Sequence, residues 1–188
     1  VQGIAAEQAI VAEVPEVARA ADWGGLVLDV WQFVFLIDAV AIQDETDLRR
    51  IFNEIRQDGM EGIVIQRMIR NGVQLMIGVA EDQLFGPLIA FGLGGIHVEI
   101  LADVCFRVTP LTARDAEEMV RSIRGYRLLE GYRGHPPADV KAIEEVLLRV
   151  SRMVEDIPEI RELDLNPIFA LRPGEGCAVV DARIRVAA

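Results

Sequence analysis

The sequence predicts an α+β fold in which helices pack on one face of a largely antiparallel sheet. Apolar residues recur at helical spacing in three segments, of which residues 136–159 form the longest. Four β-rich runs lie between residues 62 and 111 and are separated only by short turns, which is typical of antiparallel strands. With 188 residues and 52% hydrophobic content, the chain is long enough to bury a sizeable core.

The first predicted elements are buried strands in residues 23–42, the most apolar stretch of the chain. Asp29 and Asp38 interrupt this stretch, so no uncharged run reaches the roughly 18 residues that a membrane-spanning helix requires. The first residues also lack the basic flank and the cleavage site of a signal peptide. Because Cys105 and Cys177 lack CxxC spacing and are expected to stay reduced, we predict a cytoplasmic protein without a disulfide.

An amphipathic helix is predicted in residues 44–59, ending at Gly59. Its apolar residues share one helical face, and these are Leu48, Ile51, Phe52 and Ile55. We place a boundary between two lobes just before Gly62, which gives residues 1–61 and residues 62–188.

Four strands are predicted next, in residues 62–69, 73–82, 86–95 and 103–111. Asn71-Gly72 separates the first two of these strands and is a strong hairpin signal. The sequence therefore predicts that these two strands pair with each other.

Two helices and a closing hairpin complete the prediction. The helix in residues 111–125 begins at Thr112, and Asp115 supplies the second half of an acidic capping box. Residues 136–159 place apolar side chains on one face of a long helix. The last two strands are predicted in residues 160–171 and 177–186, joined across the turn at 172–176.

The charge balance restricts the partners of the chain. It carries 30 acidic and 19 basic residues, a net charge of −11, so a nucleic-acid backbone or an anionic membrane would repel it. Any phosphate must therefore be bound locally, by backbone N–H groups, a metal or single arginines. Lys141 is the only lysine, and it lies in the predicted long helix.

Polar side chains alternate with apolar ones in the first strand of the closing hairpin. Glu162, Asp164 and Asn166 share one face of this strand, and the turn is expected to bring Asp181 beside them. Such an oxygen cluster suits Mg²⁺, which one or two carboxylates commonly hold together with nucleotide phosphates. The alternative is an ordinary half-solvated hairpin whose polar residues face water, and spacing alone does not decide between the two.

Several longer motifs occur in a fixed order from about Asp44 to Val186. They are IVIQRMI, GVQLMIGVAEDQLFGPLIAFGLGGIHVEI, DVCFRVTPL, GYRLLEGYRG and PEIRELDLNPI, followed by VVDARIRV. In these motifs the chain resembles the ATP-grasp region of NDP-forming acyl-CoA synthetases (acetate–CoA ligase, ADP-forming), which are related to the succinyl-CoA synthetase β subunit. The resemblance implies an ATP-grasp fold with an incomplete first lobe in residues 1–61 and a second lobe in residues 62–188.

The resemblance also implies a nucleotide site. Asn166 and Asp181 match the residues that bind Mg²⁺ between the nucleotide phosphates in the family, and Asp164 is a neighbouring acid. Gln74 stands where the family usually carries glutamate and is expected to contact the ribose. The remaining positions implied for the adenine are the backbone groups of Gln66, Arg67, Met68 and Ile69.

Two further groups are candidates for nucleotide contacts. Gly94 and Gly95 would let the backbone approach a ligand closely, although glycines equally serve a tight turn. Arg107 is the best local candidate for a phosphate counter-charge, with an ordinary surface arginine as the alternative.

The first forty residues depart from the family pattern. Arg19 occupies the position of the histidine that relays a phosphoryl group in the family, and Ala20 that of the lysine after it. A guanidinium is always protonated and cannot act as the nucleophile. The lysines that hold the α- and β-phosphates have no counterpart, and His97 and His135 are not expected to replace the relay. Catalytic residues therefore stay unassigned, and the chain is either part of a larger enzyme or no longer turns over.

Two functions remain. The first is the nucleotide-binding part of an ADP-forming acyl-CoA synthetase, with ATP or ADP and Mg²⁺ as ligands, CoA-binding domains or a CoA-binding subunit as partners, and an oligomeric assembly. The second is a catalytically inactive regulatory domain, as in bacterial protein lysine acetyltransferases that carry a synthetase-like region. The missing histidine and lysines favour the second function, and the retained metal ligands favour the first.

Overall fold

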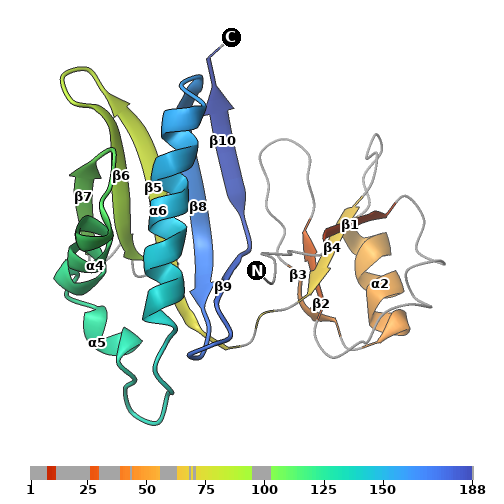
Figure 1. The fold of residues 1–188 in the computed structure, drawn as a ribbon. Coiled ribbons are helices and arrows are strands. Elements are labelled where there is room, and N and C mark those ends of the chain that lie inside the picture. The colour runs from red at the N-terminus through yellow and green to blue at the C-terminus, as the bar shows by residue number, and fades with distance from the viewer. Residues whose placement is uncertain are drawn as a thin grey trace. The chain divides into compact units, whose positions relative to one another are not determined.

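A computed structural model describes residues 8–11, 26–29, 39–42, 44–55, 63–67, 69, 71–94 and 103–187. The chain divides into two compact units, an amino-terminal unit of Ala5–Arg70 and a carboxyl-terminal unit built on Asn71–Ala188. Each unit has its own sheet, and Figure 1 labels the elements of both.

The amino-terminal unit contains a four-stranded sheet with the order β1-β4-β2-β3. Its elements are β1 (Gln8–Val11), β2 (Leu26–Asp29), β3 (Ala39–Ile42), α2 (Glu45–Ile55) and β4 (Ile63–Arg67). The Asp44 carboxylate accepts the N–H of Asp47 at 2.9 Å and begins α2, and Leu48 on this helix is fully buried. The strands predicted in residues 23–42 and the amphipathic helix are thus confirmed, while Gly59 lies outside the described residues.

The predicted pairing of the strands around Asn71-Gly72 is wrong. β4 pairs with β1 and β2 of its own unit, and the next strand belongs to the other sheet. Gly72 has φ +124°, and a Cβ there would lie 2.8 Å from the carbonyl oxygen of Ala170, so the glycine serves a close approach to another strand. The compact units divide after Arg70, and the boundary between two lobes before Gly62 stays a prediction.

The carboxyl-terminal unit contains a six-stranded antiparallel sheet. Its main path runs β10-β8-β5-β6-β7, and β9 also pairs with β8. The strands are β5 (Val73–Asp82), β6 (Gly86–Leu93), β7 (Val104–Val108), β8 (Ile160–Ala170), β9 (Cys177–Val179) and β10 (Ala182–Val186). The helices are α4 (Ala113–Ser122), α5 (Tyr126–Leu129) and α6 (Val140–Asp156).

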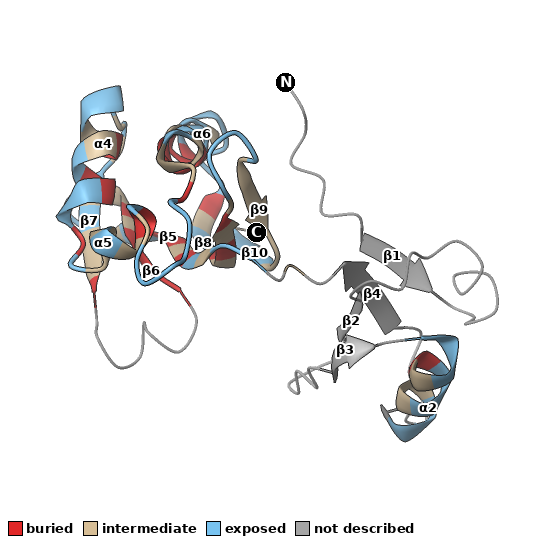
Figure 2. Ribbon diagram, turned by 90° about the horizontal axis from the view of Figure 1, so that it is seen from below, coloured by how far each residue is buried: buried red, intermediate tan, exposed pale blue. Residues whose placement is uncertain are grey.

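Helices α4 and α6 cover one face of this sheet, as the sequence predicts (Figure 1). The core lies between the helices and the sheet, and Figure 2 shows the buried residues gathered where these layers meet. Phe91 and Ile89 of β6 meet Met119 of α4 and Leu147 of α6 in this core, and all four are fully buried. The opposite face of the sheet carries the polar residues described below.

Carboxylates help to fix the starts of α4 and α6. Thr112 and Asp115 form the predicted capping box at the start of α4. Asp139 caps α6 by accepting the N–H of Ala142, and its other oxygen accepts the N–H groups of Gly174 and Gly176 at 2.8 and 3.2 Å. Asp139 therefore ties the β8–β9 turn to α6, a role that the sequence did not reveal. The short helix α5 was also not predicted.

The described helices include none that is both long and apolar enough to cross a lipid bilayer. Cys105 and Cys177 are both free thiols, as predicted. Burial raises the pKa of the Cys177 thiol to about 12, with a further contribution from Asp139. Cys177 is therefore a packing residue with little thiolate at neutral pH.

Candidate functional site

The candidate site lies on the face of the six-stranded sheet that the helices leave open. On β8, Leu163 and Leu165 are buried toward the helices, whereas Glu162 and Asp164 are exposed on the other side. This arrangement confirms the predicted separation of apolar and polar faces, which follows from the two-residue period of a strand.

A β-bulge changes the alternation in the middle of β8. Leu75 of β5 pairs with Ile168 and Ile77 pairs with Leu165, so Asn166 and Pro167 together oppose a single residue of β5. Leu165 and Ile168 are three residues apart, so a regular strand would place them on opposite faces. Because of the bulge, Ile168 and Ala170 are nevertheless buried in the core. The bulge also sets Asn166 at the point where the closing strands approach β8.

The predicted closing strand is divided in two at Val180 and Asp181. The Val180 N–H donates to the carbonyl of Pro167 at 3.1 Å, and the Asn166 N–H donates to the carbonyl of Asp181 at 3.2 Å. Asp181 thus lies directly beside Asn166, between β9 and β10. The sequence prediction that the turn brings Asp181 next to the polar face of β8 is confirmed, while the break in the strand was not foreseen.

Asp164 and Asp181 interact with each other and with one arginine. Arg183 of β10 pairs in register with Asp164, and its Nη2 lies 3.3 Å from Oδ2 of Asp181. Partial burial raises the pKa of Asp164, Asp181 raises it further, and Arg183 opposes both effects. The carboxylates therefore form an anionic pair with a single guanidinium beside them.

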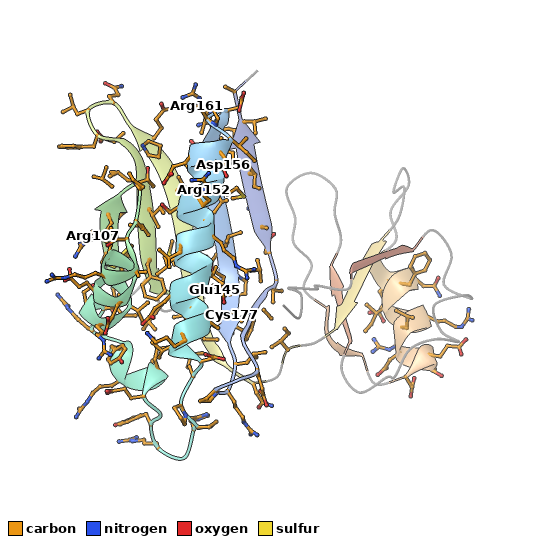
Figure 3. All side chains as sticks on the ribbon, viewed as in Figure 1. Arg107, Glu145, Arg152, Asp156, Arg161 and Cys177 are labelled. Carbon is orange, nitrogen blue, oxygen red and sulfur yellow. The ribbon has the colours of Figure 1, made fainter. Side chains whose placement is uncertain are left out.

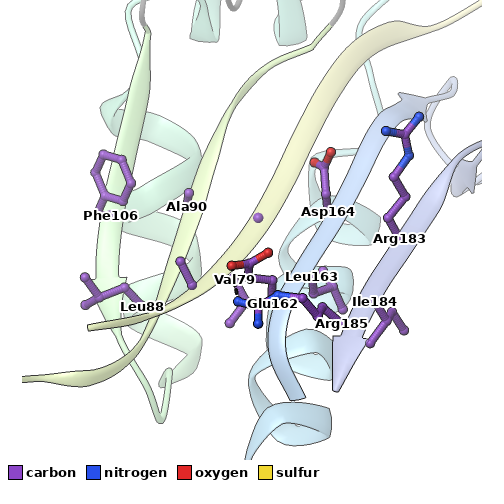
Figure 4. Close-up of a pocket in the computed structure, with 12 residues that line it drawn as sticks. Val79, Leu88, Ala90, Phe106, Glu162, Leu163, Asp164, Arg183, Ile184 and Arg185 are labelled. Carbon is purple, nitrogen blue, oxygen red and sulfur yellow. Dashed lines mark hydrogen bonds and ion pairs between the residues drawn. The ribbon is translucent and has the colours of Figure 1, made fainter. Parts of the chain in front are cut away.

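A second ion pair lies one step further along the same two strands. Arg185 of β10 pairs in register with Glu162, and its guanidinium donates a hydrogen bond to the Glu162 carboxylate. This bond lowers the pKa of Glu162. Figure 4 shows both arginines on β10 beside the two carboxylates of β8.

An open groove of about 540 Å³ is bordered by the charged side chains of Glu162, Asp164, Arg183 and Arg185. Its floor carries small and apolar residues, with Gly78 and Ala80 on β5. Figure 4 labels the others, which are Leu88 and Ala90 on β6 and Phe106 on β7. Phe106 is 59% exposed. The groove therefore joins an apolar floor to a charged wall, a combination that suits a ligand with a flat apolar part and an anionic part.

Arg107 lies on the other face of the sheet. It pairs with the fully buried Ile89, and its Nη2 lies 3.9 Å from Glu118 of α4. Figure 3 labels Arg107 on β7, next to this helix. Neighbouring residues of a strand face opposite sides of the sheet, so Arg107 faces the helices. The structure thus does not bring Arg107 together with Asp164, Asn166 and Asp181.

The other predicted nucleotide contacts lie in or next to β4, at the start of β5 and just after β6. Gln74 is exposed on β5, and its carbonyl accepts the N–H of Gly94 at 2.8 Å. A Cβ at Gly94 would lie 2.6 Å from the carbonyl oxygen of Leu75, so this glycine permits close packing of two backbone segments. Gly95 lies outside the described residues.

β4 holds the backbone positions that the sequence assigns to the adenine. Gln66 pairs with Gln8 of β1 and with Val27 of β2, and Arg67 is the last residue of the ladder, paired with Leu26. Ile69 is half-buried, and Met68 lies outside the described residues. The backbone of Gln66 and Arg67 thus takes part in the described sheet, and the adenine contact stays a prediction.

Sequence reasoning missed Arg183 and Arg185 as members of the site. The available signal was the segment DARIRV, in which the two arginines alternate with apolar residues just as the acidic residues do on the facing strand. Antiparallel pairing places these two sets opposite each other.

The donor atoms of the site fit Mg²⁺. Asp164 and Asp181 offer carboxylate oxygens and Asn166 an amide oxygen, which are ligand types that Mg²⁺ takes with phosphates and water. The described residues contain no cluster of three or more His, Cys, Asp and Glu residues that could hold a metal by itself. The set is therefore suited to a metal that a nucleotide brings with it, rather than to a closed protein site.

The sequence is similar to a known domain family and to named enzymes. A model of the ATP-grasp domain family matches residues 3–186. Acetate–CoA ligase [ADP-forming] I of Archaeoglobus fulgidus is 42% identical over 178 residues, which cover 90% of this chain and 24% of that protein. The β subunit of acetate–CoA ligase [ADP-forming] II of Pyrococcus furiosus is 45% identical over 152 residues, which cover 76% of this chain and 64% of that subunit.

A solved structure is similar over nearly the whole chain. It is acetyl-coenzyme A synthetase 1 of Ca. Korarchaeum cryptofilum in complex with coenzyme A and Mg-AMPPCP. The TM-score is 0.83 at 36% identity, and the match covers 98% of this chain and 86% of that chain. Since the family model spans almost the full sequence and the fold agrees, this chain belongs to the ATP-grasp domain family.

Proposed function

We propose that the chain is the nucleotide-binding part of an ADP-forming acyl-CoA synthetase. Such an enzyme couples acyl-CoA formation or cleavage to ATP or ADP through phosphoryl transfer. In this proposal residues 1–61 are an incomplete first ATP-grasp lobe and residues 62–188 are the second. The relatives named acetate–CoA ligase and the synthetase structure with coenzyme A and Mg-AMPPCP support this function.

The observation that carries the proposal is that Asp164, which lines the apolar groove, interacts with Asp181, whose backbone carbonyl accepts the N–H of Asn166. These three residues would hold Mg²⁺, which supplies positive charge to the nucleotide phosphates when it is bound. The small residues of β5 and β6 leave room for the flat part of a nucleotide. Gln74, the backbone of Gln66 to Ile69, Gly94 and Gly95 remain proposed nucleotide contacts, and Arg107 remains a proposed phosphate contact only if the ligand reaches the helix side of β7.

The CoA-binding partner is proposed from the lengths of the relatives. This chain covers 24% of the Archaeoglobus ligase and 64% of the Pyrococcus β subunit. We propose that CoA-binding domains or a CoA-binding subunit supply the rest of the reaction, within an oligomeric assembly in the cytoplasm. The alternative regulatory function is favoured by Arg19 and Ala20, which replace the family's histidine and lysine.

Calorimetric titration with ADP tests the metal–nucleotide site. The wild-type chain is expected to bind ADP weakly and only in the presence of Mg²⁺, because the metal ligands are present and the phosphate lysines are not. Asp181→Ala is expected to abolish the Mg²⁺-dependent part with little change in melting temperature, since it removes one of two carboxylates that repel each other.

Glu162→Ala is the matched control, because Glu162 lies on the same open face of β8 but belongs to the other ion pair. It is expected to leave the Mg²⁺ dependence intact. Equal ADP affinity in EDTA and in Mg²⁺, or a parallel collapse of melting temperature and affinity in Asp181→Ala, would show that Asp181 is not a metal ligand.

A further inference from the structure

Arg183 occupies a position that the proposed metal site does not explain. It pairs in register with Asp164, and its Nη2 lies 3.3 Å from Oδ2 of Asp181. Its side chain is 57% exposed, whereas that of Asp181 is 29% exposed. A partly exposed guanidinium thus pairs with one of the two carboxylates that would hold the metal.

A guanidinium and a divalent metal cannot share this carboxylate without repelling each other. An exposed ion pair of this kind contributes little to stability, and side-chain entropy opposes it. Coordination of the metal by two carboxylates and an amide would therefore displace the guanidinium rather than be prevented by it. Arg183 would lower the apparent metal affinity, because the metal must first break the ion pair between Arg183 and Asp181.

Among the described residues that line the groove, Arg183 and Arg185 are the cations. Arg185 is held by Glu162, which is outside the metal donor set, so metal binding would leave that pair intact. Arg107 is on the helix side of the sheet. Of the cations among the described lining residues, Arg183 is consequently the one that metal binding would release.

We propose that Arg183 is the resident counter-cation of Asp181, that a divalent metal displaces it, and that the released guanidinium then contacts the nucleotide phosphates. The second part rests on the proposed function. The exchange couples the two ligands, because a guanidinium fork binds phosphate oxygens well only when it is free. It also supplies a positive charge in a chain whose only lysine lies on α6.

The test uses the full chain and two probes, Mn²⁺ alone and ADP at saturating Mg²⁺. Arg183→Gln removes the guanidinium, and Arg185→Gln is the matched control on the same face of the same strand. Arg183→Gln is expected to bind Mn²⁺ about two- to five-fold more tightly, the scale of an exposed ion pair. The same variant is expected to bind ADP about tenfold more weakly, the scale of one charge-assisted contact. Arg183→Lys should recover part of the ADP affinity.

The two arms separate the possible results. Unchanged Mn²⁺ affinity in Arg183→Gln, or equal effects of the two glutamine variants, would overturn the exchange. Tighter Mn²⁺ together with tighter ADP binding would overturn the phosphate contact and leave Arg183 a competitor of the metal. Tighter Mn²⁺ binding in a chain that binds no ADP at all would support displacement by metal and reject the proposed nucleotide function.

Discussion

Asp164, a residue of the candidate site, illustrates how an ionised carboxyl group can lower the stability of the fold. Partial burial and the neighbouring Asp181 raise its pKa, and Arg183 offsets only part of this. The folded protein therefore holds the Asp164 proton more tightly than the unfolded chain does. The resulting stability is present at low pH and is lost as the pH rises through the raised pKa.

Asp164→Asn is predicted to stabilise the protein at pH 7, because the amide keeps the shape of the side chain without its charge. The increase in melting temperature is expected to be no more than about 3 °C, since the group is largely exposed. At pH 3, where the wild-type carboxyl is mostly protonated, the two proteins should melt together. Thermal melts at the two pH values measure this difference.

Glu162→Gln is expected to change the melting temperature in the opposite direction. Arg185 lowers the pKa of Glu162, so its contribution is present above the unfolded pKa and is lost as the pH falls. Glu162→Gln should therefore lower the melting temperature slightly at pH 7. Equal shifts in both variants would show that the two carboxylates do not differ in the folded protein.

At the scale of elements, local signals predicted most of the carboxyl-terminal unit. The Thr112–Asp115 capping box, the apolar face of α6 and the alternation in β8 each specify their element without reference to distant parts of the chain. The metal candidates on β8 followed from the same alternation. The family resemblance was confirmed by the match over residues 3–186.

Features that depend on distant partners were not predicted. Asn71-Gly72 gives the same local turn signal whether it closes a hairpin or links two sheets, and only the pairing of β4 decides between these. Arg107 was assigned to the site although its strand register turns it toward α4. Arg183 and Arg185 were missed because their importance depends on the acidic residues across from them.

Asp139 gives a prediction about how elements are joined. Asp139→Asn can still cap α6 but loses one carboxylate oxygen, which accepts the N–H groups of Gly174 and Gly176. We expect it to lower the free energy of unfolding by about 1 kcal/mol, and Asp139→Ala, which also loses the cap, by about 2–3 kcal/mol. Urea unfolding measures both values. An Asp139→Asn variant as stable as the wild type would mean that the tie to the turn contributes nothing.

At the scale of the whole molecule, the location of positive charge limits what the chain can do by itself. Lys141 lies on α6, on the helix side of the sheet, and its Nζ donates to Glu144 at 2.7 Å. The groove on the opposite face has arginines but no lysine among its described lining residues. Phosphoryl transfer depends on positive charge around the moving group, and losing one such charge commonly costs several powers of ten in rate.

The 188-residue chain is therefore predicted neither to make acyl-CoA from acid, CoA and ATP nor to take up phosphate from γ-³²P-ATP on nitrogen. Incubation with labelled ATP, followed by acid and base treatment of the protein, checks the second statement. An acid-labile, base-stable label on the purified chain would contradict it and would direct attention to His97 or His135 as the acceptor.

The end strand β10 also bears on how the protein avoids aggregating with itself. All five of its residues are exposed, and an end strand offers unpaired backbone groups to any other strand that meets it. If a second copy added its own β10 in antiparallel register about Ile184, Arg183 of one chain would face Arg185 of the other, and the like charges would oppose the contact. The arginines of the groove thus also protect an exposed sheet edge, so replacing both with neutral residues would remove a barrier to fibre-like assembly.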